Sequence, residues 1–252
     1  MITCSVPYKA FNFPVGERHV QIEETPIFGS IVIRWEYEHD NELIEVMLLV
    51  NAIRQRDASA IIELVCPYVP FSRQDRVHVK GEPLSIQFVA NCINASRFER
   101  VTITDPHSDV TPALLERCTV IEQHEIFGPV LQYQREFVLV SPDGGALKKV
   151  YKLAAIVKAE AVIECSKRRD VRTGAIDGVV VPSYYAQYAG YEAIIVDDIC
   201  DGGKTFVELA KALQREGAKK ITLMVTHGFF TKGLGVFEGL IDHIYTRKGQ
   251  VK

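Results

Sequence analysis

Short apolar runs rich in β-branched residues alternate with helical periodicity along the whole chain. The pattern predicts strands over residues 31–37, 60–66 and 100–104 and amphipathic helices over 41–56 and 84–96. It then restarts, with strands over 137–140, 161–164, 179–181, 192–196, 220–225 and 241–245 and helices over 145–158 and 205–216. Strands that alternate with helices build mainly parallel sheets covered by helices on both faces, so we expect the α/β class.

The two series of elements each occupy about half of the chain, so they predict two similar domains, 1–131 and 132–252. Each domain is expected to be a mainly parallel sheet flanked by helices. The joint is placed at 127–134, where the stretch FGPVLQYQ interrupts the pattern. This inference depends on the order of the elements, because the two halves have no identifiable sequence repeat.

Composition and charge exclude several classes of protein. The chain has 252 residues, of which 47% are hydrophobic and 24% charged, and its formal net charge is −3. These values are typical of a soluble globular protein and argue against a disordered chain or one whose main task is to coat nucleic acid. No run of 18 apolar residues is present, and residues 1–10 lack the pattern of a signal peptide. We therefore expect no membrane association.

The six cysteines are spread almost evenly and form no C-x-x-C pair. This spacing fits neither a zinc site nor a disulfide scaffold. We expect free thiols in a reducing compartment and a cytoplasmic location. The cysteines are Cys4, Cys66, Cys92, Cys118, Cys165 and Cys200.

The strongest chemical signal follows the apolar residues 193–196. Asp197 and Asp198 come directly after this run, and the stretch DGGKT then opens a helix. Glycines let backbone N–H groups form an anion-binding nest, to which a helix N-terminus adds partial positive charge. Two carboxylates can accept hydrogen bonds from adjacent sugar hydroxyls, so a phosphorylated sugar suits both halves. The alternative is an acidic helix cap followed by a tight turn. The loop consists of Asp201, Gly202, Gly203, Lys204 and Thr205.

Four other predicted strands also end in polar stretches, at the sheet edge where ligands of α/β proteins bind. Each stretch has a simple structural alternative: a solvated loop for the first, a structural histidine for the second, a helix cap for the third and a solvated basic face for the fourth. The stretches are VCPYVPFSRQDR, TITDPHSD, VLVSPDGG and VIECSKRR.

Together these motifs carry a family resemblance. VDDICDGGKT resembles the phosphoribosyl pyrophosphate (PRPP) signature of the phosphoribosyltransferase superfamily, which leaves open whether PRPP is made or consumed. With PFSRQDRVHVKGEPLS, TDPHS, SPDGG and SKRR in the same order, the chain from about residue 13 to 227 resembles the ribose-phosphate pyrophosphokinase family, and GERHVQIEE near the N-terminus is also similar. The resemblance implies two domains of phosphoribosyltransferase type, with ATP on the N-terminal side and the sugar phosphate on the C-terminal side. It also implies transfer of the diphosphoryl group of MgATP to the anomeric hydroxyl of ribose 5-phosphate, giving PRPP and AMP for nucleotide or NAD synthesis.

The resemblance also implies roles for individual residues. Lys167 and Arg169 are the expected catalytic pair, on a flexible loop that stabilises charge on the transferred group. Phe13 and Glu17 match positions that contact adenine from a neighbouring subunit, which implies a homo-oligomer, a dimer or hexamer, with the active site near a subunit interface. The expected ATP-binding residues are Phe13, Glu17, Arg73, Gln74, Asp75 and His107, the expected Mg²⁺ ligands are His107 and Asp143, and the sugar phosphate is expected at Asp197, Asp198, Asp201, Gly202, Gly203, Lys204 and Thr205.

The sequence departs from the family at two places. Val15 stands where an acidic residue is usual, which alters the expected adenine contact. The sugar-phosphate loop commonly reads Asp-Thr-Gly-Gly-Thr, whereas this chain has glycine at 202 and a cation at Lys204. One hypothesis is an acceptor that carries more than a monophosphate, such as ADP-ribose. The alternative is that Lys204 strengthens the grip on ribose 5-phosphate or points to solvent.

Two further functions compete with diphosphoryl transfer. A phosphoribosyltransferase that consumes PRPP would share the acidic loop but has no need for Arg73, His107 or the loop of Lys167. A catalytically silent regulatory homologue would be expected to lose Lys167 and Arg169, and both are present. The diphosphokinase is therefore the leading interpretation.

Overall fold

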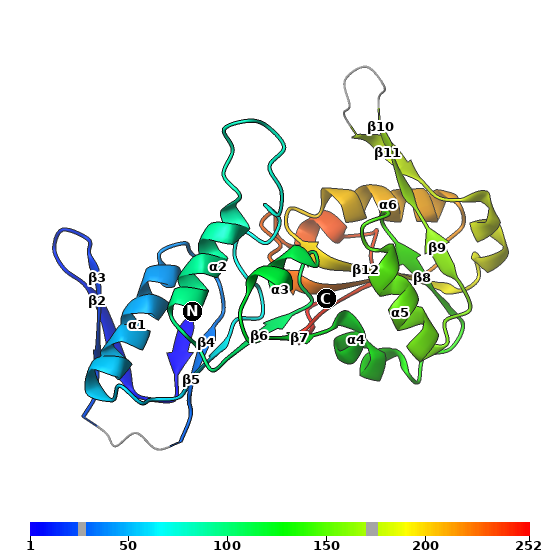
Figure 1. Cartoon of the computed structure of the whole chain (residues 1–252). Helices are drawn as coiled ribbons and strands as arrows, with labels where there is room; N and C mark the ends of the chain where they lie inside the picture. The colour runs from blue at the N-terminus through cyan, green and yellow to red at the C-terminus, as the bar shows by residue number, and fades with distance from the viewer. Residues whose placement is uncertain (25–28, 170–175) are drawn as a thin grey trace. The chain divides into compact units, whose positions relative to one another are not determined.

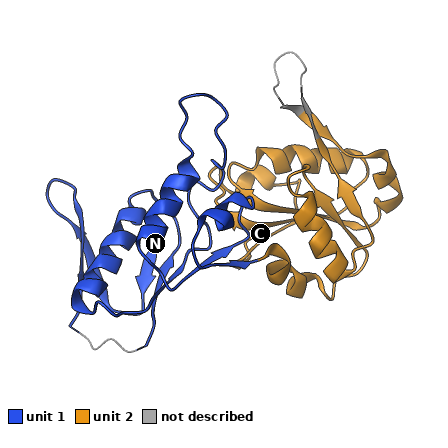
Figure 2. Cartoon of the chain, in the orientation of Figure 1, with its two compact units in different colours: residues 1–121 blue, residues 122–252 orange. Residues whose placement is uncertain are grey.

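The chain folds into two compact units, Met1–Ile121 and Glu122–Lys252, called unit 1 and unit 2 below (Figure 2). The computed structural model describes residues 1–24, 29–169 and 176–252, without the side chains of 167–169 and 176–177 (Figure 1). Both units combine a mainly parallel sheet with helices, which confirms the α/β class.

Unit 1 contains a five-stranded sheet in the order β1-β4-β5-β6-β7, parallel except where β1 runs antiparallel to β4. A separate antiparallel hairpin, β2–β3, precedes β4 and lies beside α1 (Figure 1). The strands are β1 (Ile2–Cys4), β2 (Tyr8–Asn12), β3 (Arg18–Ile22), β4 (Ile31–Trp35), β5 (Ile62–Val65), β6 (Arg100–Thr104) and β7 (Cys118–Ile121), and the helices are α1 (Glu42–Arg56), α2 (Ser85–Ala95) and α3 (Val110–Leu114).

The core of unit 1 lies on one face of its sheet. Alternate strand residues such as Ile33, Leu64 and Ile103 are fully buried and share a single cluster with residues of α1 and α2. The opposite face carries polar residues, including the ion pair of Glu63 and Arg100 at 2.9 Å. The expectation of helices on both faces is therefore wrong for this unit, because polar residues alternate with apolar ones along its strands.

Unit 2 contains a six-stranded sheet in the order β15-β14-β13-β12-β8-β9, with only the pair β14–β15 antiparallel. A second antiparallel hairpin, β10–β11, extends from this unit. The strands are β8 (Phe137–Ser141), β9 (Val162–Glu164), β10 (Ser166–Arg169), β11 (Ile176–Val180), β12 (Glu192–Cys200), β13 (Ile221–Gly228), β14 (His243–Thr246) and β15 (Gly249–Gln250). The helices are α4 (Gln123–Leu131), α5 (Leu147–Val157), α6 (Lys204–Arg215) and the 3₁₀ helices η1 (Ser183–Tyr188) and η2 (Leu234–Phe237).

Both faces of the unit 2 sheet are buried. Val140 and Ile195 belong to a cluster that includes residues of α6, whereas their neighbours Leu139 and Ile194 belong to a second cluster with α4 and α5. The middle stretches of β8 and β12, residues 137–140 and 193–196, are therefore apolar at consecutive positions, as expected for parallel strands covered on both sides. Here the expected helices on both faces are confirmed.

The segment that interrupts the sequence pattern is a helix of unit 2. Glu122 and Glu125 form a capping box at the start of α4, in which the Glu122 N–H donates to Glu125 Oε1 at 2.9 Å. Phe127 and Leu131 are buried in the cluster that α4 shares with α5. This packing holds α4 in helical form although Pro129 lies inside it, and the units divide N-terminal to the boundary expected after residue 131.

The six cysteines, all within the described residues, form no disulfide bond with one another. Within the described residues, no helix is both long enough and apolar enough to cross a lipid bilayer.

Candidate active site

The acidic pair of unit 2 lies inside a strand rather than after it. β8 pairs with β12 only as far as Val140 opposite Ile195, whereas β13 continues to pair until Gly228 lies opposite Cys200. The prediction that β12 ends before Asp197 is therefore wrong, because pairing with β13 extends the strand past both aspartates. Their carboxylates stand beyond the end of β8, at the carboxyl edge of the sheet, where ligands bind in this class of fold.

The surroundings of Asp197 disfavour its negative charge. Burial, followed by the charge of Asp198 and a hydrogen bond between the two side chains, raises the pKa of Asp197 well above its ordinary value, and Asp143 adds to the effect. The Asp198 N–H donates to Asp197 Oδ1 at 2.9 Å, and Asp198 is 7% exposed. A ligand that supplies hydroxyl donors or positive charge would relieve this repulsion.

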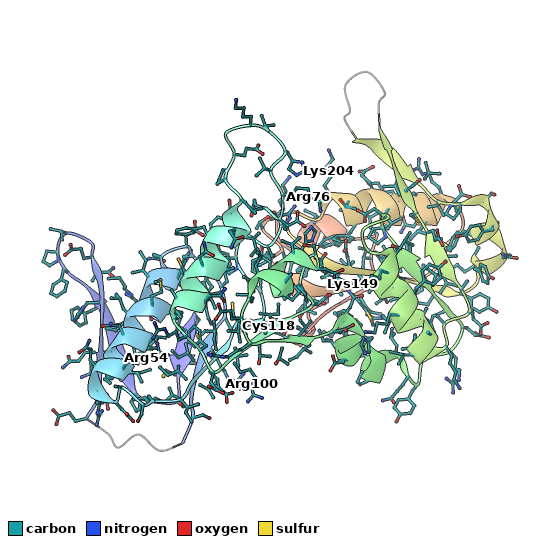
Figure 3. All side chains as sticks on the ribbon, in the orientation of Figure 1. Arg54, Arg76, Arg100, Cys118, Lys149 and Lys204 are labelled. Carbon is teal, nitrogen blue, oxygen red and sulfur yellow. The ribbon has the colours of Figure 1, made fainter. Side chains whose placement is uncertain are left out.

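The loop after β12 requires glycine at position 203. Gly203 has φ +77°, and a Cβ placed there would lie 2.6 Å from the ring of Phe237. Helix α6 begins at the next residue, Lys204, whose side chain is exposed (Figure 3). The first N–H groups of a helix have no partner within the helix and can bind an anion, so the phosphate cradle at this loop stays a prediction that α6 makes physically reasonable.

A second segment, which follows β13, holds this loop in place. The Thr231 N–H donates to the Asp201 carbonyl oxygen at 3.1 Å, and Thr231 Oγ1 donates to Asp201 Oδ1 at 2.8 Å. A Cβ at Gly202 would lie 3.5 Å from the side chain of Lys232. Lys232 was not among the predicted site residues, and the cue available in the sequence was its place just after the strand that ends at Gly228.

Asp143 caps the turn that leads into α5. The Ser141 hydroxyl donates to the Asp143 carbonyl oxygen at 2.8 Å, and Asp143 Oδ1 accepts hydrogen bonds from the N–H groups of Gly145 at 2.9 Å and Ala146 at 3.4 Å. Asp143 therefore closes the turn before α5, whose N-cap residue is Ala146, rather than acting as the helix cap considered as the alternative to metal binding. The same carboxylate also contributes to the raised pKa of Asp197, so it belongs to the acidic field at the edge of the sheet.

In unit 1, the segments after β5 and β6 meet at Asp75. The Asp75 carboxylate is buried and accepts hydrogen bonds from Arg76 Nε at 2.8 Å and from a terminal guanidinium nitrogen of Arg76 at 3.2 Å. Arg76, with help from a hydrogen bond to Ser108 and from His107, lowers the pKa of Asp75 from 3.8 to about 2. The segment between β5 and α2 also forms the long loop of unit 1 in Figure 1, and Arg76 is labelled on it in Figure 3.

The other predicted ATP-binding side chains of unit 1 face solvent. Arg73, Gln74 and His107 are all exposed. The structure therefore brings His107 near Asp75 but uses the Asp75 carboxylate within the fold.

The hairpin β2–β3 presents an exposed aromatic cluster. Phe13 is 46% exposed, and its ring lies 5.5 Å from the rings of Phe11 and His19. The turn is closed by the Phe13 N–H, which donates to the Glu17 carbonyl oxygen at 2.8 Å. Phe13 is thus a surface residue.

The base of this hairpin is tied to α1 by a buried carboxylate. Glu45, which is 6% exposed, accepts hydrogen bonds from the Tyr8 hydroxyl at 2.9 Å and from Arg18 Nε at 2.7 Å. This contact fixes the strands that lead to Phe13 and Glu17.

Lys167 and Arg169, the predicted catalytic pair, both belong to strand β10. Lys167 pairs with Val179 and Arg169 with Ile176 in the antiparallel hairpin of β10 and β11. The side chains of Lys167 and Arg169, and all of residues 170–175, lie outside the described part of the chain.

The described residues contain no group of three or more histidine, cysteine, aspartate or glutamate side chains arranged to hold a metal ion by themselves. Of the two predicted ligands, His107 belongs to unit 1 and Asp143 to unit 2.

Two family models match the chain. The N-terminal domain of ribose phosphate pyrophosphokinase matches residues 3–96, and the phosphoribosyl synthetase-associated domain matches residues 180–238. Between them they include the loop after β5 and the loop after β12.

Full-length relatives and a solved structure agree with these matches. The chain is 31% identical over 231 residues to a ribose-phosphate pyrophosphokinase of Thermococcus kodakarensis, covering 88% of this chain and 78% of the relative. It is 28% identical over 246 residues to a ribose-phosphate pyrophosphokinase of Mycoplasma pneumoniae, covering 93% and 73%. The fold is similar to that of phosphoribosylpyrophosphate synthetase from Mycobacterium smegmatis, with a TM-score of 0.81, 22% identity and coverage of 96% of this chain and 80% of that one. The chain belongs to the ribose-phosphate pyrophosphokinase family.

Proposed function

We propose that this protein is a ribose-phosphate diphosphokinase that transfers the diphosphoryl group of MgATP to the anomeric hydroxyl of ribose 5-phosphate, giving PRPP and AMP. The observation that carries the proposal is the pairing, on β12 and the loop after it, of two carboxylates with a glycine-closed helix N-terminus. Its relatives are named for this activity.

The acceptor is proposed to bind at the carboxyl edge of the unit 2 sheet. The N–H groups at the start of α6 bind the 5′-phosphate, and the carboxylates of Asp197 and Asp198 accept hydrogen bonds from the ribose hydroxyls. Hydroxyl donors favour the charged form of a carboxylate, so sugar binding would lower the raised pKa of Asp197.

The nucleotide is proposed to bind to residues of unit 1. The exposed side chains of Arg73 and Gln74 are available to bind phosphate and base, and exposed His107 is available to contact the triphosphate. Exposed Phe13 provides an aromatic face for adenine, with Glu17 beside it across the turn. Asp75 is proposed to act indirectly, because its carboxylate is already bonded to Arg76.

Mg²⁺ is the proposed cofactor, and the residues present fit it in one particular way. Mg²⁺ usually keeps several waters and is held by one or two carboxylates together with substrate phosphates. The raised pKa of Asp197 marks a region that a cation would stabilise. Asp143 and His107 are the proposed protein ligands, and the metal would neutralise charge on the phosphates.

Lys167 and Arg169 are proposed to stabilise the charge that develops on the transferred group. Phosphoryl-type transfer depends more on positioning and charge stabilisation than on covalent chemistry. We expect Lys167→Ala to lower kcat by about 100-fold to 1,000-fold while the Kd for ATP stays within about threefold, because the lysine would act mainly in the transition state. Rapid-quench assays with calorimetry of ATP binding test this, and full turnover in the variant would remove Lys167 from its role.

The proposed activity is tested by incubating the protein with MgATP and ribose 5-phosphate and identifying the products by mass. We expect AMP and PRPP in equal amounts, both dependent on Mg²⁺. Consumption of PRPP with a nucleobase instead would indicate a phosphoribosyltransferase. Failure to form AMP with ribose 5-phosphate or any other ribose acceptor would contradict the proposal and favour the silent homologue.

A homo-oligomer in the cytoplasm is the proposed working state. The exposed aromatic cluster of the β2–β3 hairpin suits contact with a nucleotide bound to a neighbouring subunit, and the free thiols suit a reducing compartment. Light scattering coupled to size exclusion tests the oligomer, and a monomer at assay concentration that is fully active would contradict it.

A further inference from the structure

Two lysines from different segments border the loop of residues 201–205, which is called the acceptor loop below. Lys204 is the first residue of α6, and Lys232 lies in the segment that follows β13. The Lys232 chain passes over Gly202, since a Cβ at that position would lie 3.5 Å from Lys232 Cδ and Cε and 3.7 Å from its Cγ. These are ordinary van der Waals distances, so the stem of Lys232 lies directly beside the loop.

Hydrogen bonds of the residues just before Lys232 fix the segment on which it lies. The preceding residue, Thr231, is bonded twice to Asp201, at 3.1 Å through its N–H and at 2.8 Å through its hydroxyl. The Phe229 N–H donates to the Cys200 carbonyl oxygen at 2.8 Å, which continues the attachment to the end of β12. The segment after β13 is thus docked on the acceptor loop along several residues.

Neither ammonium group is neutralised by the fold. In the described part of the chain, no carboxylate lies within ion-pair distance of Lys204 or Lys232, and both residues are exposed. A phosphate monoester carries about 1.5 to 2 negative charges at pH 7, and the open N–H groups of a helix start already favour such a group. Two additional cations match a ligand with negative charge beyond that of one monophosphate.

We propose that Lys204 and Lys232 bind a second phosphate attached to the 5′-phosphate of the acceptor, so that this enzyme takes ribose 5-diphosphate esters such as ADP-ribose. The proposal rests on the proposed function, whose reaction it keeps. The anomeric hydroxyl oxygen attacks the β-phosphorus of ATP, the bond from that phosphorus to the oxygen shared with the α-phosphate breaks, AMP leaves and the hydroxyl proton is released. The substrate class differs only at the 5′ end, where the two lysines stand.

The test compares ribose 5-phosphate and ADP-ribose as acceptors with MgATP, following AMP release and product mass. Unmodified protein is expected to turn over ADP-ribose with a kcat/KM at least about tenfold above that for ribose 5-phosphate, the effect of one charge-assisted contact. Lys232→Ala is expected to lower that ratio about tenfold, and Lys204→Thr to lower it by a similar factor. Lys219→Ala, an exposed lysine between α6 and β13, is the matched control and should leave the ratio unchanged.

The outcomes separate this proposal from the proposed function. Turnover of ribose 5-phosphate alone, or equal losses for both acceptors in Lys232→Ala, would overturn the two-lysine site while leaving the diphosphokinase intact. Absence of AMP release with either acceptor would overturn both. Calorimetry of each acceptor at two salt concentrations adds a measurement that does not depend on turnover, and ADP-ribose binding should weaken more with salt.

Discussion

Asp75 of unit 1 and Asp197 of unit 2 stand near the carboxyl edges of similar sheets in opposite electrostatic surroundings. Arg76 and Ser108 bond to Asp75 and lower its pKa to about 2, whereas burial and Asp198 raise the pKa of Asp197. The first acid is neutralised by its own unit and stabilises the fold. The surroundings of Asp197 disfavour its charged form and raise its pKa, and shifted pKa values are frequent at binding and catalytic sites. We infer that the buried Asp197 carboxylate destabilises the folded state of unit 2 and that it is retained for ligand binding.

The largest expected effect comes from removing a carboxylate at the unit 2 edge. We expect Asp198→Ala to lower kcat/KM for the ribose acceptor about 100-fold, because charge-assisted hydrogen bonds to the sugar are lost. The Kd for ATP should stay within about threefold. Steady-state kinetics and calorimetry check this result, and a change confined to ATP affinity would show that the sugar has been assigned to the wrong residues.

The next effect concerns stability in unit 1. We expect Asp75→Asn to lower the free energy of unfolding by about 1 to 2 kcal/mol at pH 7, because the buried carboxylate loses its bonds to Arg76 and Ser108. A carboxylate with a lowered pKa stabilises the fold above its ordinary pKa of 3.8 and loses this contribution as pH falls through about 2. The difference between variant and unmodified protein should therefore shrink below about pH 4. Urea unfolding at several pH values measures it, and a difference independent of pH would contradict the assignment.

A smaller effect of opposite sign is expected for Asp197→Asn. A carboxylate with a raised pKa favours the folded state only while it is protonated, so the stability of the unmodified protein falls as pH rises from about 4 through the raised pKa. The variant lacks this loss and should be more stable by about 1 kcal/mol at pH 7, while its activity falls. Hydrogen exchange resolved by peptide would locate the gain in unit 2. A variant less stable than the unmodified protein at neutral pH would remove the contrast with Asp75.

The smallest expected effect concerns the thiol of Cys200, whose pKa is raised in part by Asp197 and Asp201. Burial, together with Asp197 and Asp201, raises the pKa of Cys200 to about 12. We expect Cys200 to react with alkylating reagents at pH 8 only after unfolding, so Asp197→Asn, which is expected to stabilise unit 2, should slow the reaction by less than about tenfold. Peptide mass analysis follows the modification, and rapid labelling of native Cys200 would be inconsistent with a buried, negatively charged neighbourhood.

Much of the fold followed from local pattern. Strand β6 begins and ends where the periodicity placed it, and α1, α2, α5 and α6 agree with the predicted helices to within a few residues. The N-terminal strands β1, β2 and β3 were not predicted, because each is short and only half-buried, so its apolar pattern is weak. Helix α4 was missed because Gly128 and Pro129 disfavour a helix locally, and only packing against α5 overrides them.

The candidate site likewise combines features that the local sequence predicted with features that only tertiary packing decided. The acidic pair and the glycine loop were visible in the sequence, since each is a contiguous motif. The length of β12 was not, because its last residues are held by β13 rather than by their own propensity. Lys232 was also missed, because its place after a strand does not by itself indicate that it lies over Gly202.

The sequence by itself determined the main alternation of strands and helices, the family and the residue types available for phosphate and sugar, because these properties are encoded in short continuous stretches. Tertiary structure alone decided the electrostatic state of each acid and the partners of the acceptor loop. Asp75 meets Ser108 and Asp201 meets Thr231 only after strands distant in the chain have paired. Charge interactions depend on distance and burial, so folding turned similar acids into a structural ion pair in one unit and a buried, mutually repelling pair in the other.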